Sequence, residues 1–156
     1  MLRLDWATCA CVLASLVLPA PLALADAPVK GEVLVILAKE QAGEIDPGLK
    51  KLPALQKPPF SSYKSMKVLS TTDVELTSDK AATVALPNGR TLQLKLLERM
   101  PDGRHKVEVS INRPGKQDYL PLLTVIASGE PFFVAGQTHQ GGTLVIGVRV
   151  GSKGKN

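Results

Sequence analysis

Residues 81–111 read AATVALPNGRTLQLKLLERMPDGRHKVEVSI, which is three short segments of alternating polarity separated by two turns. Asn88 with Gly89 and Asp102 with Gly103 tolerate the positive φ that a two-residue hairpin turn requires. The stretch therefore predicts a three-stranded antiparallel meander. Its apolar face must be covered by a second layer, since a single sheet with one apolar side does not stand alone.

Two-residue turns at both positions predict a register for this meander. They place Leu94 opposite Thr83 in one hairpin and opposite Ile111 in the other. Because side chains alternate between faces with a period of two, six apolar residues then share one face. These are Leu92, Leu94, Leu96, Val107, Val109 and Ile111. Val84, Leu86 and Leu97 fall outside this division, so we expect the second face to be partly covered.

The rest of the chain from residue 26 continues in short extended segments, with turn signals about every 8 to 14 residues. Residues 32–39 hold a continuous apolar run that is typical of a strand buried on both faces. Asp46 followed by Pro47 predicts a short helix in a crossover over residues 40–60. We predict an all-β fold over residues 26–150, a single antiparallel β-sandwich or partly closed barrel of about eight strands with one short helical crossover.

The first 25 residues have the composition of an export signal, with Arg3, an apolar run over 7–18 and small residues at Ala23 and Ala25. We predict cleavage after Ala25 and a periplasmic or extracellular protein that does not span the membrane. An uncleaved anchor and a buried helix are the alternatives. Both cysteines lie within this signal, so the mature chain has no disulfide to stabilise it. Residues 151–156 are predicted to form a disordered tail.

The chain has a formal net charge of +5, and several lysines lie close together in sequence. They are Lys50, Lys51, Lys57, Lys64 and Lys67. Such a group is either a solvated surface or an attraction for an anionic surface polymer or lipid head group. Nucleic acid is not an expected partner, because no aromatic residues are interleaved with the basic ones to stack on bases.

Neither a metal, a cofactor nor a catalytic residue is predicted. His105 and His139 are the only histidines, and metal sites in proteins take three or four ligands. No serine occupies the Gly-x-Ser-x-Gly turn that carries the nucleophile of many hydrolases.

Two segments are candidate binding sites. Gln137, Thr138, His139 and Gln140 lie between Gly136 and Gly142, and polar loops on a rigid sheet often bind ligands. The alternative is a plain connection in which the glycines supply turn geometry.

The second candidate is the aromatic pair Phe60 and Tyr63, which follows Pro58 and Pro59. Exposed aromatic residues beside prolines form recognition surfaces. The alternative is that both rings pack beneath the edge of the sheet, because their large area favours burial.

Three short motifs are PFSSYK at residues 59–64, LPNGRTL at 86–92 and GGTL at 141–144. Through them the chain resembles a loose group of uncharacterised small exported proteins of Gram-negative bacteria. That resemblance implies export but no activity.

We expect a non-enzymatic protein of the cell envelope that binds or assembles with another envelope protein. The alternative is a small periplasmic hydrolase, or a loop-presenting inhibitor of an envelope enzyme. The last apolar segment, residues 143–150, is the predicted open edge at which a partner strand adds, because only the tail follows it.

Overall fold

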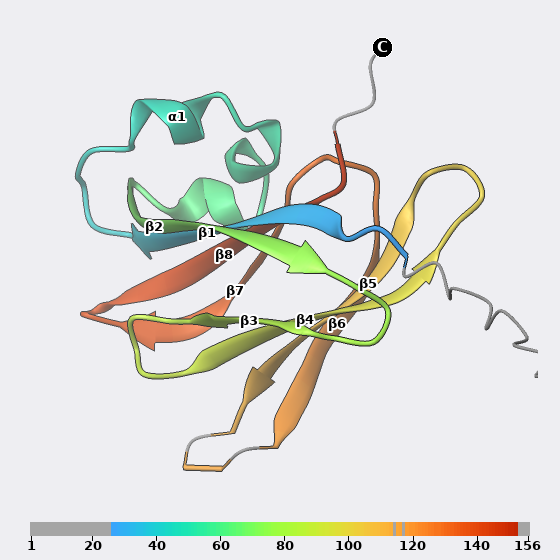
Figure 1. Cartoon of the computed structure of the whole chain (residues 1–156). Helices are drawn as coiled ribbons and strands as arrows, with labels where there is room; N and C mark the ends of the chain where they lie inside the picture. Colours follow the sequence, from blue (N-terminus) through green and yellow to red (C-terminus); the bar gives the residue numbers. More distant parts are fainter. Residues whose placement is uncertain (1–25, 114, 117, 153–156) are drawn as a thin grey trace, which may run out of the picture.

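The computed structural model describes residues 26–113, 115–116 and 118–152, and within them eight strands form two antiparallel sheets (Figure 1). The strands are β1 (Val29–Lys39), β2 (Ser65–Leu76), β3 (Ala82–Ala85), β4 (Thr91–Arg99), β5 (His105–Asn112), β6 (Tyr119–Ala127), β7 (Phe132–His139) and β8 (Gly142–Val150). The first sheet has the order β2-β1-β8-β7, and the second has the order β3-β4-β5-β6. The sheets face each other without closing into a barrel, so the predicted β-sandwich is confirmed.

The core lies between the two sheets and takes alternate residues from each strand. All six residues of the predicted apolar face are at most 2% exposed. From the first sheet, β1 and β8 contribute a matching set on their inner side. These are Val33, Val35, Leu37, Leu144, Ile146, Val148 and Val150. Burial on this scale supplies the main favourable term for a domain without disulfides.

The first hairpin has a three-residue loop, so its predicted register is wrong by one residue. Leu86 N donates to Arg90 O at 2.7 Å, and Gly89 N donates to Leu86 O at 3.0 Å. Pro87 suits the second position of a type I turn, and Gly89 follows with a φ of +80°. Leu94 therefore pairs with Ala82 instead of Thr83. This register brings Val84 and Leu86 into the core, which explains why neither fitted the predicted division.

The second hairpin has the same three-residue turn, and a bulge in β4 reverses the effect of this turn on the register. Met100 N donates to Arg104 O at 2.8 Å across a three-residue loop, which would place the two strands one residue out of phase. Between Leu96 and Glu98 the register shifts by one residue, because Leu97 has no partner on β5. Leu94 therefore pairs with Val109, not with the predicted Ile111. The bulge returns the apolar residues of both strands to one face, and it leaves Leu97 41% exposed.

A small second cluster, the cap cluster, covers part of the outer face of the first sheet. Residues 40–64, called the cap here, contain the helix α1 (Pro47–Lys50) and two 3₁₀ turns, η1 (Pro53–Gln56) and η2 (Phe60–Ser62). Figure 1 shows this segment in teal above β1 and β2. It packs on Ile36 and Ala38 of β1. The predictions that the crossover covers part of the sheet and that β1 is buried on both faces are confirmed.

Strand β2 contributes side chains to both hydrophobic clusters, because a bulge divides it. Val35 pairs with Ser70 and Ile36 pairs with Val68, so Leu69 has no partner on β1. Met66 and Val68, before the bulge, contact the cap cluster, whereas Val74 and Leu76, after it, lie in the main core. The strand is continuous, and the extra residue moves its apolar side chains from one face to the other.

Strand β8 is central, so the predicted open edge at residues 143–150 is wrong. It pairs with β1 on one side and with β7 on the other. Gly151 continues this order, since its backbone N donates to Lys30 O at 2.9 Å.

The predicted signal at 1–25 and the tail residues 153–156 lie outside the described residues. No helix in the described ranges is long and apolar enough to cross a membrane.

Candidate functional site

The segment predicted as a polar loop is mostly strand. Gln137, Thr138 and His139 belong to β7, and His139 pairs with Gly142 of β8. The turn between the strands consists of Gln140 with a φ of +46° and Gly141 with a φ of +70°. Two consecutive left-handed residues are the geometry of the tightest hairpin turns. The prediction of a loop over residues 136–142 is therefore wrong, because only Gln140 and Gly141 lie outside the strands.

The side chains of this segment go to different places. Gln137 Oε1 accepts a hydrogen bond from Arg90 Nη1 at 2.8 Å, which ties β7 of the first sheet to the β3–β4 turn of the second. His139 is half-buried, and Thr138 is exposed. Gln137 thus links the two sheets, and Thr138 offers its hydroxyl to solvent.

A cavity of about 360 Å³ lies beside the β7–β8 turn and brings the two predicted segments together. It is lined by Ala38, Lys39, Glu40, Gln41, Tyr63, Thr138, Gly141, Gly142 and Thr143. Tyr63 comes from the end of the cap, whereas Thr138 comes from β7, so only the tertiary fold makes them neighbours. We call this space the hairpin cavity, and its polar groups are of mixed charge.

Phe60 and Tyr63, the predicted aromatic pair, pack on the outer face of the first sheet. The rings of Phe60 and Phe133 meet edge to face, with 6.0 Å between their centroids. A Cβ on Gly147 would lie 2.6 Å from Cε1 of Phe133, so the ring occupies the space above this glycine. Phe60 and Tyr63 are both partly buried and pack against the cap cluster. Their side chains therefore connect the cap to β7 and β8.

A second cavity, of about 310 Å³, lies between the cap and Met66 of β2. Its lining residues are Ile45, Leu49, Lys50, Leu55, Gln56, Ser61, Tyr63 and Met66. Tyr63 borders this space as well as the hairpin cavity. We call it the cap cavity. Four of its eight lining side chains are apolar, and the four polar ones come from the cap.

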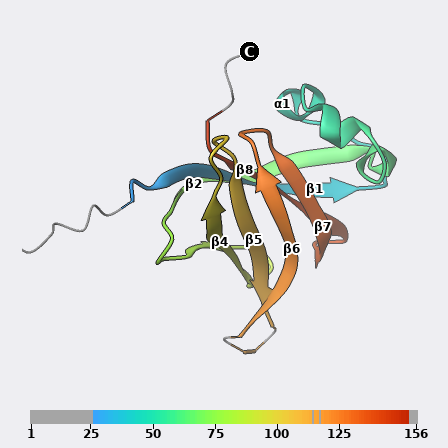
Figure 2. The same cartoon turned by 90° about the vertical axis from the view of Figure 1, so that its right-hand side faces the viewer.

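The most exposed apolar surface lies on β6, which sequence reasoning did not single out. Leu120 is 39% exposed, Leu122 is 38% exposed and Ile126 is 46% exposed. The strand reads YLPLLTVIA and carries no charged side chain, although it is the edge of the second sheet. Figure 2 shows β6 and β7 as the edges on the same side of the sandwich. The signal in the sequence was an apolar run with no charge to protect it.

His105 lies where β5 begins, next to both ends of the described chain. Its Nδ1 is buried and has no hydrogen-bond partner among the described residues. Burial, and then the nearby Arg99 guanidinium, hold the pKa of His105 below its ordinary value of 6.5. The Arg99 side chain also donates to the backbone oxygen of Ala27 and lies 3.9 Å from the Asp26 carboxylate. These contacts attach the start of the described chain to the second sheet.

Among the described residues, no group of three or more His, Cys, Asp or Glu side chains could hold a metal ion. Comparison with known proteins gives no match to any protein-family model, curated protein or solved structure. The resemblance to small exported proteins stays a prediction from its three motifs.

Proposed function

We propose that this protein is a non-enzymatic protein-binding or assembly module of the cell envelope. In this proposal residues 1–25 direct export, cleavage follows Ala25, and strand β6 binds an extended segment of another envelope protein. The observation that carries the proposal is the exposed, uncharged and apolar edge at β6. An open edge presents unpaired backbone groups that a partner strand can satisfy.

The other edge strands have features that discourage strand addition. Residues 44–46 cover one part of β2, where Asp46 N donates to Met66 O at 3.0 Å. Elsewhere β2 carries the bulge at Leu69 and exposed charges at Asp73 and Glu75. Strand β3 has only four residues. Strand β7 is interrupted by a bulge at Gly136, whose φ is +131°. Short edges, bulges and charges are the usual protections against unwanted pairing.

Strand β6 is protected over only part of its length. Pro121 and the unpaired Leu122 interrupt its first half. From Leu123 to Ala127 its pairing with β5 is regular. Ile126 pairs with Lys106, so it points away from the core and lies beside a basic side chain. A partner strand with apolar side chains facing Ile126, and with acidic residues near Lys106, would complement this surface.

A substitution on the exposed side of β6 tests the proposal. Ile126→Glu places a charge where the partner would pack, and the new carboxylate can pair with Lys106 in the unbound protein. Leu97→Glu is the matched control, because Leu97 is a leucine of similar exposure, 41%, on an interior strand. Tagged mature proteins are incubated with envelope extract from the native host, and the captured partners are quantified after thermal melts confirm that each variant is folded.

We expect Ile126→Glu to weaken capture about tenfold or more, equivalent to about 1.4 kcal/mol, and Leu97→Glu to leave it unchanged. Equal capture by both variants and the parent protein would reject β6 as the binding edge. A concentration-dependent dimer that Ile126→Glu abolishes would show that β6 pairs with a second copy, and it would reject a different envelope protein as partner.

A further inference from the structure

We propose that the cap cavity binds a single-chain anionic amphiphile, of the class of a fatty acid. The alkyl chain lies among Leu49, Leu55 and Met66, and the acid group lies at the rim beside Lys50. This site is on the first sheet and involves no residue of β6, so it stands independently of the partner-binding proposal.

The apolar wall of the cavity belongs to the folded core of the cap. Leu49 is 2% exposed, Leu55 is 4% exposed and Met66 is 3% exposed, and they come from α1, η1 and β2. Methionine adapts its shape readily to a bound chain. The apolar half of the lining favours an alkyl group over water.

Backbone hydrogen bonds fix this wall to the sheet. Met66 N donates to Glu44 O at 3.1 Å, and Asp46 N donates to Met66 O at 3.0 Å. The Asp46 carboxylate also accepts a hydrogen bond from Val68 N at 2.7 Å. One side of the cavity is therefore held rigidly by β2, which lowers the entropy cost of binding.

The polar lining is gathered at the rim. Lys50, Gln56 and Ser61 are exposed, and the Gln56 side chain donates to the backbone oxygen of Lys50, which joins α1 to η1. The hydroxyl-bearing side chains of Ser61 and Tyr63 line the same space. One ammonium and two hydroxyl donors can meet an acid group whose chain is inside.

The local charge selects an anion over a cation. Residues 39–67 contain six lysines and three carboxylates. The lysines at positions 50, 51, 57, 64 and 67 are all exposed. Such an excess attracts anionic ligands and repels cationic ones.

The volume of the cap cavity limits the length of the ligand's alkyl chain. At about 30 Å³ for each non-hydrogen atom, the value for water in the liquid, roughly ten such atoms fill 310 Å³. That volume suits one medium-length chain and excludes the two long chains of a membrane phospholipid. We therefore commit to a free single-chain ligand.

Isothermal titration calorimetry with the mature protein tests the proposal, using saturated carboxylates from hexanoate to dodecanoate below their micelle concentrations. We expect the affinity to rise about fourfold for each added methylene and to level off near ten carbons. Alkyl trimethylammonium ions of the same lengths should bind at least tenfold more weakly. Vesicles of phosphatidylglycerol and phosphatidylcholine are tested in parallel.

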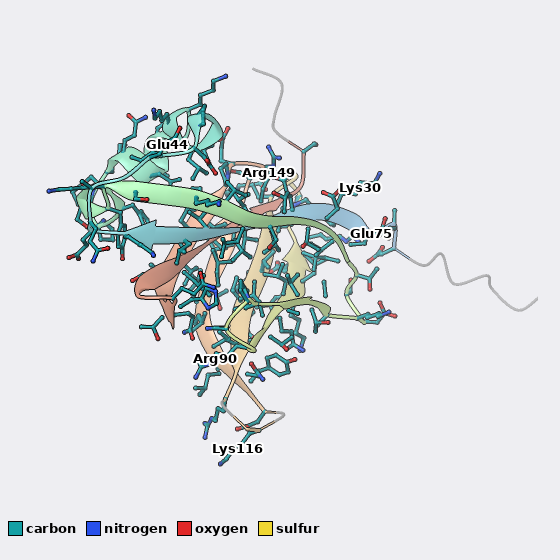
Figure 3. All side chains as sticks on the ribbon, turned by 90° about the vertical axis from the view of Figure 1, so that its left-hand side faces the viewer. Lys30, Glu44, Glu75, Arg90, Lys116 and Arg149 are labelled. Atoms are coloured by element: carbon teal, nitrogen blue, oxygen red, sulfur yellow. The ribbon has the colours of Figure 1, made fainter. Side chains whose placement is uncertain are left out.

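Two substitutions in the cap and two controls locate the binding. Ser61→Trp fills the cavity from its exposed rim and should abolish binding, and Lys50→Glu should weaken it tenfold or more. Lys116→Glu makes the same charge change far from the cap and should have no effect. Figure 3 shows Lys116 at one end of the molecule and Glu44, a residue of the cap, at the other. Ile126→Glu should also leave the affinity unchanged. Thermal melts establish that each variant is folded.

Failure of all carboxylates to bind saturably would overturn the proposal. Equal affinity for the trimethylammonium series, or undiminished binding by both folded cap variants, would overturn the assigned ligand class or site. Binding to the vesicles without binding to free carboxylates would overturn the choice of a free ligand. If Ser61→Trp does not fold, Lys50→Glu alone decides the location.

Discussion

Leu69, Leu97 and Leu122 have the same structural role at the level of single residues. Each is the unpaired residue of a bulge on its strand, and each is between 36% and 41% exposed. A bulged residue stands outside the alternation of the strand, so an apolar side chain there need not face the core. These three leucines mark points at which the strands change register.

Gly147 should be intolerant of a side chain, in contrast to Gly48. The ring of Phe133 occupies the place of a Cβ at Gly147, whereas nothing lies within 4 Å of that position at Gly48. We expect Gly147→Ala to lower the free energy of unfolding by about 1–3 kcal/mol through overpacking. Gly48→Ala should be neutral or raise it by up to about 1 kcal/mol, since it lies in α1.

Urea denaturation of both variants measures these changes. The clash can be isolated by repeating Gly147→Ala in a Phe133→Leu background, where the lost ring should make the alanine less costly. A Gly147→Ala loss that is the same in both backgrounds would show that Phe133 is not the cause.

His105 should make stability depend on pH. Its pKa is below 6.5 in the folded protein and near 6.5 in the unfolded chain, so the unfolded state binds more protons between these values. Stability is therefore full above pH 6.5, falls as the pH decreases through this window and levels off, for this group, below the folded pKa. The buried Nδ1 has no acceptor for the added proton among the described residues.

Denaturant melts between pH 7.5 and 4.5 measure this dependence, with His105→Gln as the comparison. The parent protein should lose more stability than the variant as the pH falls below 6.5. Parallel curves for the two proteins would contradict the assignment to His105.

At the level of elements, the meander was predictable as far as its faces but not its register. Alternating polarity identified six core residues correctly, because burial depends on which face a residue occupies. The Asn-Gly and Asp-Gly pairs favour two-residue loops, but a proline precedes each pair. Proline at this position favours a type I turn with glycine next in the left-handed region, which gives a three-residue loop. The signal was therefore present at Pro87 and Pro101.

Two other features could not be read from local sequence. The central position of β8 results from pairing with β1, more than a hundred residues away in the chain. The apolar run from Leu144 to Val148 resembles that of β1 and is the signal for a central strand in the sequence. Tyr63 and Thr138 border one cavity only because the cap folds over the end of the sheet. The periodicity of a single segment predicts neither feature, because both depend on contacts between segments far apart in the chain.

The bulge at Leu97 should matter more than its side chain. Deleting Leu97 removes the residue that restores the apolar faces of β4 and β5 after the three-residue turn. We expect this deletion to cost more than about 4 kcal/mol, or to prevent folding, because it moves a whole set of apolar side chains. Leu97→Thr should change stability by less than about 0.5 kcal/mol, as is usual for an exposed position.

Circular dichroism and urea melts separate the two outcomes. A deletion variant that melts like the parent protein would show that the hairpin can close in another register.

At the scale of the whole molecule, the two halves of the sandwich differ in what they leave open. The cap covers part of the outer face of the first sheet and part of the β2 edge. The described residues include no corresponding cap on the second sheet, and its edge strand β6 is apolar and exposed. The first sheet thus holds the cavities formed by the cap, and the second presents the edge that we propose binds a partner.

Hydrogen exchange in the complex is the most direct test of that claim. The captured complex and the unbound protein are compared by mass spectrometry, peptide by peptide, at the same pH and temperature. We predict that amides of β6 (Tyr119–Ala127) exchange more slowly in the complex, because a partner strand covers this edge, while those of β2 exchange at the same rate in both. Slower exchange confined to β2 or to the cap, with β6 unchanged, would contradict the account.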